Sequence, residues 1–204
     1  MVNGLLSGSN FGSNGQQQTT QQGSQQQQSQ VSQPQQQQQQ QQVQPAATTA
    51  PTTSTPSSSS GLSAFAQQTL DRHNYYRARH TSTPALRWSS SLAADAQAWA
   101  NRCVFEHANN AVTGQGENLA WGYPDTNSVI DAYYSESSGY AYGASQPSDW
   151  HSVGHFTQMV WVATTDVGCA VTSCSGGAQF HVCRYYPPGN VQGQYASNVL
   201  PPRS

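Results

Sequence analysis

The residues of this 204-residue chain that are most capable of chemistry are few, and all charged residues and histidines lie after residue 70. There are six histidines and only three glutamates, at Glu106, Glu117 and Glu136. His107, His155, Glu117 and Glu136 each adjoin aromatic, core-like sequence. Such a set can ligate zinc through two imidazole nitrogens and carboxylate oxygen, leaving room for water. Alternatively, the carboxylates fix the tautomer and orientation of each imidazole. Spacing alone does not distinguish a shared site from four separately hydrogen-bonded polar residues.

The other potentially reactive residues have simpler interpretations. Ser152, near His155, is a possible nucleophile, but an exposed loop serine is the more common case. The chain has no G-x-S-x-G nucleophile motif and no glycine-rich phosphate loop. We expect the remaining histidines to be structural or surface residues: His73, His80, His151 and His181.

Composition divides the chain into two parts. Residues 1–63 consist mainly of Gln, Ser, Thr, Gly and Pro, with an unbroken Gln run at 35–42, and this composition predicts a disordered leader. Its Ser/Thr/Pro-rich end suits an extended stalk, although the Gln run is also typical of self-association. Residues 64–204 are long enough for one domain with a hydrophobic core. A net charge of −2 without any lysine argues against a nucleic-acid partner, and no apolar run is long enough for a transmembrane segment.

Four cysteines lie in the second part, and none forms a C-x-x-C pair suited to zinc or redox chemistry. Their even number predicts two disulfides and an oxidising compartment. Cys169 and Cys183 flank a turn and could join the two strands of a hairpin, which would leave Cys103 to pair with Cys174, but the sequence allows three connectivities. The first residues lack a charged n-region and an apolar h-region. We therefore expect an extracellular protein whose signal peptide is missing from this chain.

Helices precede strands in the second part. Helical spacing of apolar residues and capping by Ser, Thr or Asn predict three helices, at about 63–79, 89–103 and 126–136. The segment that carries Glu117 contains several glycines and is predicted as a loop. Strands are predicted at 156–163, 167–172 and 178–185. On this prediction His155 heads the first strand and shares a face with Thr157, Met159 and Trp161. The fold class is therefore α+β, with helices packed on an antiparallel sheet.

Several stretches resemble the CAP superfamily, which comprises the cysteine-rich secretory proteins, the insect venom antigen 5 proteins and the plant pathogenesis-related 1 proteins. GHFTQMVW (154–161) and HVCRYYPPGN (181–190) are similar to its two signature stretches. HNYYRARH (73–80), CVFEH (103–107) and GENLAWG (116–122) match further family blocks in the same order. The resemblance covers about residues 64–200, and the Gln-rich leader is most similar to fungal members.

The resemblance implies an α-β-α sandwich, secretion, and a cleft holding a His–Glu–Glu–His tetrad. At matching positions the tetrad is His107, Glu117, Glu136 and His155. The resemblance further implies that the two histidines bind Zn²⁺ or another divalent ion while the glutamates support them. The disulfides that it implies are Cys103–Cys174 and Cys169–Cys183.

The resemblance also implies a lipid ligand. Similar fungal members bind sterols through an aromatic-rich loop before the signature stretch, and some members bind fatty acids between helices. In this chain the corresponding aromatic residues are Tyr140, Tyr142, Trp150 and Phe156. Many plant relatives have a third disulfide there, and this chain does not. The alternative is that the aromatic residues pack over the position of that absent bridge.

Three functions are consistent with these features. The first is a secreted, non-enzymatic and monomeric protein that binds sterols or fatty acids. The second is a metal-dependent peptidase or other hydrolase, with Glu117 or Glu136 as the base that activates a zinc-bound water. The third is a protein that interacts with the cell wall or a host surface, with residues 1–63 as its stalk.

Overall fold

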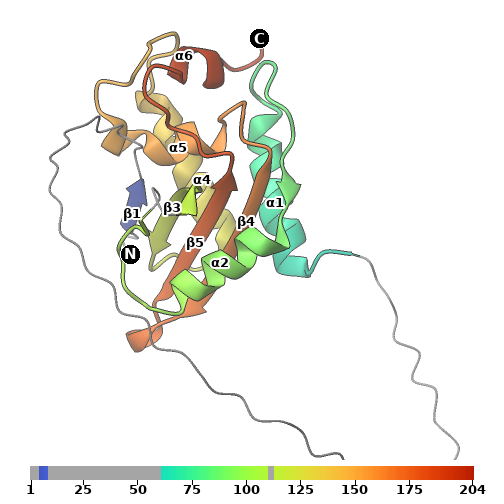
Figure 1. The fold of residues 1–204 in the computed structure, drawn as a ribbon, viewed down its shortest axis with the longest axis vertical. Coiled ribbons are helices and arrows are strands. Elements are labelled where there is room, and N and C mark those ends of the chain that lie inside the picture. The colour runs from blue at the N-terminus through green and yellow to red at the C-terminus, as the bar shows by residue number, and fades with distance from the viewer. Residues whose placement is uncertain (1–4, 9–60, 110–112) are drawn as a thin grey trace, which may run out of the picture. The chain divides into compact units, whose positions relative to one another are not determined.

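The computed structural model describes the backbone of residues 5–8 and the full structure of residues 61–109 and 113–204 (Figure 1). Most of the predicted leader, including its Gln run and stalk, lies outside the described residues. Four leader residues, Leu5–Gly8, form strand β1, which the sequence did not predict. Strand pairing uses main-chain N–H and C=O groups, so a short Leu-Leu-Ser-Gly segment without alternating side chains can form an edge strand. The remaining elements are α1 (Ala64–Arg77), β2 (Arg87–Trp88), α2 (Ser90–Ala100), β3 (Gly116–Trp121), α4 (Thr126–Ser135), η1 (Glu136–Gly139), η2 (Trp150–Ser152), α5 (Gly154–Met159), β4 (Asp166–Ser173), η3 (Ser175–Gly177), β5 (Gln179–Tyr186) and α6 (Tyr195–Asn198).

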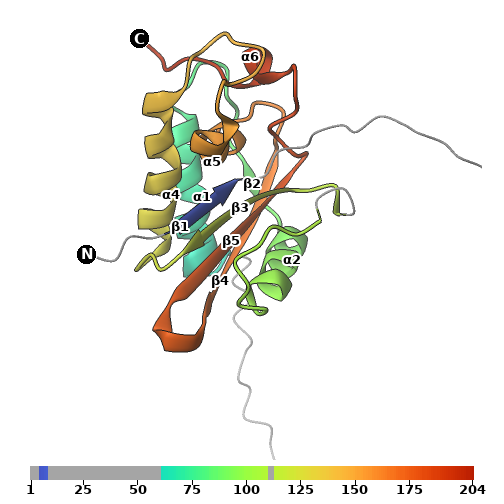
Figure 2. The same cartoon turned by 90° about the vertical axis from the view of Figure 1, so that its left-hand side faces the viewer.

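The strands form one sheet in the order β1-β3-β5-β4-β2. All neighbours are antiparallel except β2 and β4, which pair in parallel. Figure 2 shows α2 on one face of the sheet and α1, α4 and α5 on the other. The structure therefore has the α-β-α arrangement and α+β class that the sequence predicted.

Each face of the sheet has its own apolar core. Between α2 and the sheet, the core is formed by small helix residues and large strand residues, including Ala96, Ala100, Leu119, Phe180 and Val182. Between the sheet and the other helices, the core contains Tyr76, Ala120, Val129, Ile130, Tyr133 and Met159. Because both faces of β3 and β5 are covered, these strands are buried along almost their whole length.

Helices begin where a side chain can accept a main-chain N–H. Ser63 caps α1 and Ser89 caps α2, in agreement with the predicted starts. The predicted caps of α4, Thr126 or Asn127, are wrong, because the carboxylate of Asp125 accepts the N–H of Ser128 at 2.8 Å. Among the described residues, no helix is long and apolar enough to span a membrane.

The strand predicted at 156–163 is wrong, because Gly154–Met159 form the short helix α5. All six of its residues are buried, and a helix without an exposed face shows no helical alternation of polar and apolar residues. His155 therefore shares no strand face with Thr157. The loop predicted around Glu117 is also wrong, since Gly116–Trp121 form β3. One of the glycines that suggested a loop, Gly116, lies so close to Gln158 that an added Cβ would overlap its side-chain amide.

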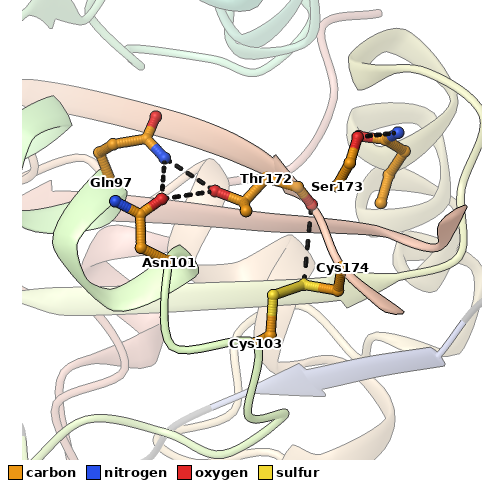
Figure 3. Close-up of a disulfide and its surroundings, with 7 residues drawn as sticks. Gln97, Asn101, Cys103, Thr172, Ser173 and Cys174 are labelled. Carbon is orange, nitrogen blue, oxygen red and sulfur yellow. Dashed lines mark hydrogen bonds between the residues drawn. A yellow bond between two sulfur atoms is a disulfide. The ribbon is translucent and has the colours of Figure 1, made fainter. Parts of the chain in front are cut away.

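Two disulfides are present, and they are the pairs that the family resemblance implied. Cys169 and Cys183 join opposite residues of β4 and β5, and Cys103 and Cys174 join the end of α2 to the end of β4. Beside the latter bond, Gln97, Asn101 and Thr172 form a closed set of hydrogen bonds between α2 and β4 (Figure 3). This end of α2 is therefore anchored immediately before the segment that carries His107.

Candidate functional site

The four residues predicted to form the site are arranged as two histidine–glutamate pairs. Nδ1 of His107 lies 2.7 Å from Oε1 of Glu117, and Nδ1 of His155 lies 2.6 Å from Oε1 of Glu136. A proton on Nδ1 is donated to the carboxylate, so Nε2 of each ring carries the lone pair. Both pairs use the same ring atom, which is the arrangement expected when a carboxylate fixes the orientation of an imidazole.

The first pair is built on β3. The side chain of Glu117 is fully buried, and it accepts the main-chain N–H of Ala108 at 3.0 Å. Its second oxygen lies 2.8 Å from Nη2 of Arg184 on β5, so the buried carboxylate has a charged partner. Burial lowers the pKa of Arg184, and the charge of Glu117 opposes that effect. Arg184 was not predicted from the sequence, although a lone charge inside the apolar sequence HVCRYY is a signal that could have found it.

The second pair joins two elements that are 19 residues apart. Glu136 follows α4, and its Oε2 accepts the main-chain N–H groups of His155 and Phe156, each at 3.0 Å. No side chain next to α5 caps its start, because the preceding residue is Val153. Glu136 therefore takes the place of an N-cap residue for α5 while also orienting the ring of His155.

The two pairs adjoin each other through Tyr133 and Asn118. The ring of Tyr133 stacks on that of His155, with centroids 4.9 Å apart and an interplanar angle of 9°. Burial raises the pKa of Tyr133 well above its usual value, and the charges of both Glu136 and Glu117 add to this effect. Asn118, next to Glu117 in β3, donates from Nδ2 to the carbonyl oxygen of His155 at 3.1 Å. The charges of both carboxylates thus raise the pKa of the same tyrosine.

The ligand atoms available for a cation are the imidazole nitrogens. Nε2 of His155 is buried and has no hydrogen-bond partner within the described part of the chain. The four residues do not form a cage, because in that same part the one cluster of three or more ligand atoms within 4.8 Å is His73, Cys169 and Cys183. The two sulfur atoms of that cluster are bonded to each other, so it offers no thiolate. The donor set fits an ion held by imidazole, with the carboxylates behind the rings.

Two of the other histidines are structural, as predicted. His73 is fully buried, with Nδ1 2.8 Å from the carbonyl of Thr69 and Nε2 2.9 Å from the hydroxyl of Tyr185. Burial lowers the pKa of His73 to about 4. Nδ1 of His80 lies 2.7 Å from the carbonyl of Leu200.

His181, His151 and Ser152 lie outside the two pairs. His181 is buried, and burial lowers its pKa. His151 is an exposed residue of η2. The hydroxyl of Ser152 is donated to the carbonyl of Asp149 at 3.0 Å.

The predicted lipid-binding aromatic residues are only partly accessible. Phe156 is completely buried and Tyr140 is 6% exposed, in a cluster with Val160, Trp161 and Tyr195. Tyr142 is half-buried and packs edge-on against Tyr140. Trp150 is half-buried and lies over the ring of His151. Packing therefore accounts for Tyr140 and Phe156, whereas Tyr142 and Trp150 keep part of their surface exposed.

A separate groove lies beside α1 and the start of α4. Its volume is about 530 Å³, and its lining residues include Gln68, Arg72, Tyr75 and Asn127. Arg72 also forms an ion pair across the two helices with Asp131, with 2.6 Å between Nε and Oδ1. The guanidinium group is thus held in place at the edge of the groove.

The family model "Cysteine-rich secretory protein family" matches residues 70–185. The chain is 42% identical over 146 residues to "Probable pathogenesis-related protein" of Arthroderma benhamiae, covering 64% of this chain and 47% of that protein. It is 38% identical over 157 residues to "Secreted protein RBT4" of Candida albicans, covering 68% of this chain and 41% of that protein. It is 39% identical over 153 residues to "Golgi-associated plant pathogenesis-related protein 1" of Homo sapiens, covering 71% of this chain and 97% of that protein. The chain thus spans about half the length of these fungal relatives.

Solved structures share the fold. "Crystal structure of NaASP2 with Zn2+" matches with a TM-score of 0.59 at 24% identity, covering 72% of this chain and 90% of that one. "Structure of BmVAL-1" matches with a TM-score of 0.55 at 26% identity, covering 65% and 81%.

Proposed function

The chain belongs to the cysteine-rich secretory protein family, and from this membership we propose that it is a secreted binding protein that holds a divalent cation at His107 and His155. The observation that carries the proposal is the pairing of each Nδ1 with a glutamate. This pairing directs both Nε2 lone pairs away from the carboxylates, as in metal sites where a carboxylate supports the histidine ligand. Two disulfides and a fungal relative named as a secreted protein support an extracellular location.

Zinc suits this donor set best. Two neutral imidazoles with water in the remaining positions match its preference for nitrogen ligands and tetrahedral geometry. A buried polar atom without a partner costs about 1–3 kcal/mol, so the environment of Nε2 of His155 favours a ligand. When bound, such a cation supplies a fixed positive charge to which an anionic or polar ligand group can bind.

Calorimetric titration of the full chain with Zn²⁺ tests the cation site. We expect saturable binding that is lost in both His107→Ala and His155→Ala. His151→Ala is the matched control, because His151 is exposed and lies only four residues from His155. Protons compete with zinc for imidazole nitrogen, so binding should be weaker in acidic solution. Equal zinc affinity in all four proteins, or at pH 7.5 and 5.5, would refute the assignment.

For the cargo, we propose small lipids. The groove beside α1 and α4 is open to solvent, and its lining includes Asp71 as well as Arg72. Nε and Nη2 of Arg72 donate to Asp131, so its Nη1 is the nitrogen that can pair with the carboxylate of a fatty acid. Tyr142 and Trp150 offer partly exposed aromatic surface for a sterol.

Binding of labelled palmitate and cholesterol separates the two lipid classes. Arg72→Gln should weaken palmitate binding and leave cholesterol binding unchanged, and Trp150→Ala should do the reverse. Absence of saturable binding of either lipid to the wild-type chain would refute a lipid cargo.

A metal-dependent hydrolase is the second candidate, and the closeness of two carboxylates to two imidazoles favours it. However, Glu136 already accepts three N–H groups, and Glu117 accepts from His107 and Ala108 and pairs with Arg184. A carboxylate engaged in this way is a poor base for water, so we rank binding above hydrolysis. Cleavage of a peptide library that is abolished by a chelator and by His107→Ala would reverse this ranking.

Interaction with a cell wall or host surface is the third candidate. It predicts that retention of the protein in the wall fraction depends on residues 1–63. Unchanged retention after their deletion would count against it.

A further inference from the structure

A second pocket, with a volume of about 630 Å³, lies on the side of the sheet that α2 covers. Figure 2 shows that α1 and α4, which line the groove described above, lie on the opposite side. The second pocket is lined by Asp95 and Trp99 of α2, by Arg184 of β5, and by Gln115, just before β3. Its volume is within the range of small-molecule sites. None of these residues is a proposed zinc ligand or lipid contact.

Three buried polar atoms of the pocket's residues have no hydrogen-bond partner in the described part of the chain. Two are Nε and Nη1 of Arg184, a residue that is 2% exposed and whose Nη2 lies 2.8 Å from Oε2 of Glu117. The third is Oε1 of Gln115, whose Nε2 donates to Oδ2 of Asp95 at 2.7 Å. Buried polar atoms almost always have a partner, because an unpaired one loses its hydrogen bonds to water. The pocket therefore favours a ligand that can both donate and accept.

The indole of Trp99 forms an aromatic wall of the same pocket. Its Nε1 donates to the carbonyl of Glu106 at 2.8 Å, which fixes the orientation of the half-buried ring. The guanidinium of Arg102 lies over the ring, with Cζ 4.0 Å from the centroid, but Arg102 is exposed and is free to move off it. Arg184 adjoins the same ring, with Cζ 5.8 Å from the centroid. A group that stacks on the indole would therefore lie next to the free donors.

The charges around the pocket cancel. Its charged lining residues are Arg102, Arg184 and Asp95, and Arg184 is already paired with the buried carboxylate of Glu117. Two positive charges thus face two negative ones, so the pocket selects for no ionic ligand. Hydroxyl groups suit it better, since each has one donor hydrogen and two acceptor lone pairs. The C–H face of a sugar ring also suits the electron-rich face of an indole.

We propose that this pocket binds a neutral saccharide, with one sugar ring on Trp99 and its hydroxyls at Arg184 and Gln115. The chemistry is common to glucans, chitin and mannans, so the experiment has one arm for each. The inference does not rest on the proposed cation or lipid ligands.

NMR titration of the full chain with three neutral hexasaccharides tests the pocket. The probes are hexamers of β-1,3-linked glucose, β-1,4-linked N-acetylglucosamine and α-1,6-linked mannose. We expect saturable binding of at least one, with shifts of the Nε–H signal of Arg184 and the indole N–H signal of Trp99. The Nε–H signal of Arg77 is the internal control and should not move, because this buried group donates to the carbonyl of Pro84.

Two glutamine variants test the contact with the free acceptor. Gln115→Met keeps the length of the side chain and removes its amide, so the saccharide should bind about fivefold more weakly, the factor that one hydrogen bond contributes. Gln97→Met is the matched control and should bind as the wild type does, because the amide of Gln97 donates to Asn101 and Thr172 outside the pocket. Saccharide binding should be unchanged in the presence of a chelator, so this proposal and the zinc site fail separately.

Three outcomes would overturn the proposal. One is the absence of saturable binding of all three hexasaccharides to the wild-type chain. Another is equal affinity of Gln115→Met and Gln97→Met for the saccharide that binds. The third is competition by inorganic sulfate, since the pocket would then be a site for anions.

Discussion

Replacing Glu136 by glutamine should destabilise the protein and weaken cation binding at the same time. The carboxylate accepts three donors, which are Nδ1–H of His155 at 2.6 Å and the main-chain N–H groups of His155 and Phe156 at 3.0 Å. A glutamine at this position offers one oxygen and one NH₂ group. At least one of the three N–H donors would then face the NH₂ group, which is itself a donor. Since the side chain of Glu136 is only 12% exposed, water cannot fully replace the lost acceptor.

The magnitude follows from the kinds of hydrogen bond lost. A hydrogen bond to a charged group contributes about 1.5–3 kcal/mol, and a neutral one contributes about 0.5–1.5 kcal/mol. If the glutamine oxygen keeps the two main-chain donors, each bond loses about 1 kcal/mol. His155 can then move its ring proton to Nε2 and accept from the new NH₂ group, which limits the further cost. We expect a total loss of about 2–3 kcal/mol in the free energy of unfolding.

Urea denaturation measures this loss, and Glu106→Gln is the matched control because Glu106 is the exposed member of the three glutamates. The control should change stability by about 0.5 kcal/mol or less. Nitrogen NMR of the imidazole should show the proton on Nδ1 of His155 in the wild type and on Nε2 in Glu136→Gln, with reduced zinc affinity in the variant. Equal urea midpoints for the two variants would refute the capping of α5 by Glu136, and an unchanged tautomer would refute its control of the ring.

Three further perturbations have definite expected results. His73 has a pKa of about 4 in the folded state, below the usual 6.5, so the unfolded state takes up a proton first as the pH falls. The free energy of unfolding should therefore be highest above pH 6.5 and fall by about 3 kcal/mol toward pH 4. In urea titrations at several pH values, His73→Phe should reduce this dependence of stability on pH. Replacing Cys103 and Cys174 by serine removes a disulfide between residues that are 71 apart in the sequence. In the chain-entropy model this should lower the free energy of unfolding by about 4 kcal/mol, and an unchanged melting temperature would contradict it. Gly168→Ala places a Cβ against main-chain atoms of α2 and should lower the melting temperature sharply, whereas Gly61→Ala, where a Cβ meets nothing within 4 Å, should not.

The sequence predicted the fold best where local chemistry dominates. Serine caps and helical spacing located α1 and α2, and turn residues located the hairpin of β4 and β5. It failed at α5, because Gly154–Met159 are buried on all sides and their sequence carries no helical period. The cap of α5 is supplied by Glu136, 19 residues earlier, so no local start signal exists.

The sequence predicted which four residues form the candidate site, but it did not predict how they pair. The rarity of glutamate and the family motifs selected the four residues, but only the structure shows that His107 pairs with Glu117 and His155 pairs with Glu136. Arg184 could not be assigned a role from the sequence, because its contact with Glu117 depends on the register of β3 against β5. Tyr133 likewise joins the site only through the packing of α4 on α5.

The double role of Glu136 also bears on how the length of this protein can change during evolution. One carboxylate joins the end of α4 to the start of α5, so both ends of the intervening segment are fixed independently of its length. Lengthening a loop between fixed ends costs only about 0.6 kcal/mol for each doubling. Insertions into the more exposed part of this segment, between the buried residues Tyr140 and Val153, should therefore leave the imidazole of His155 in place.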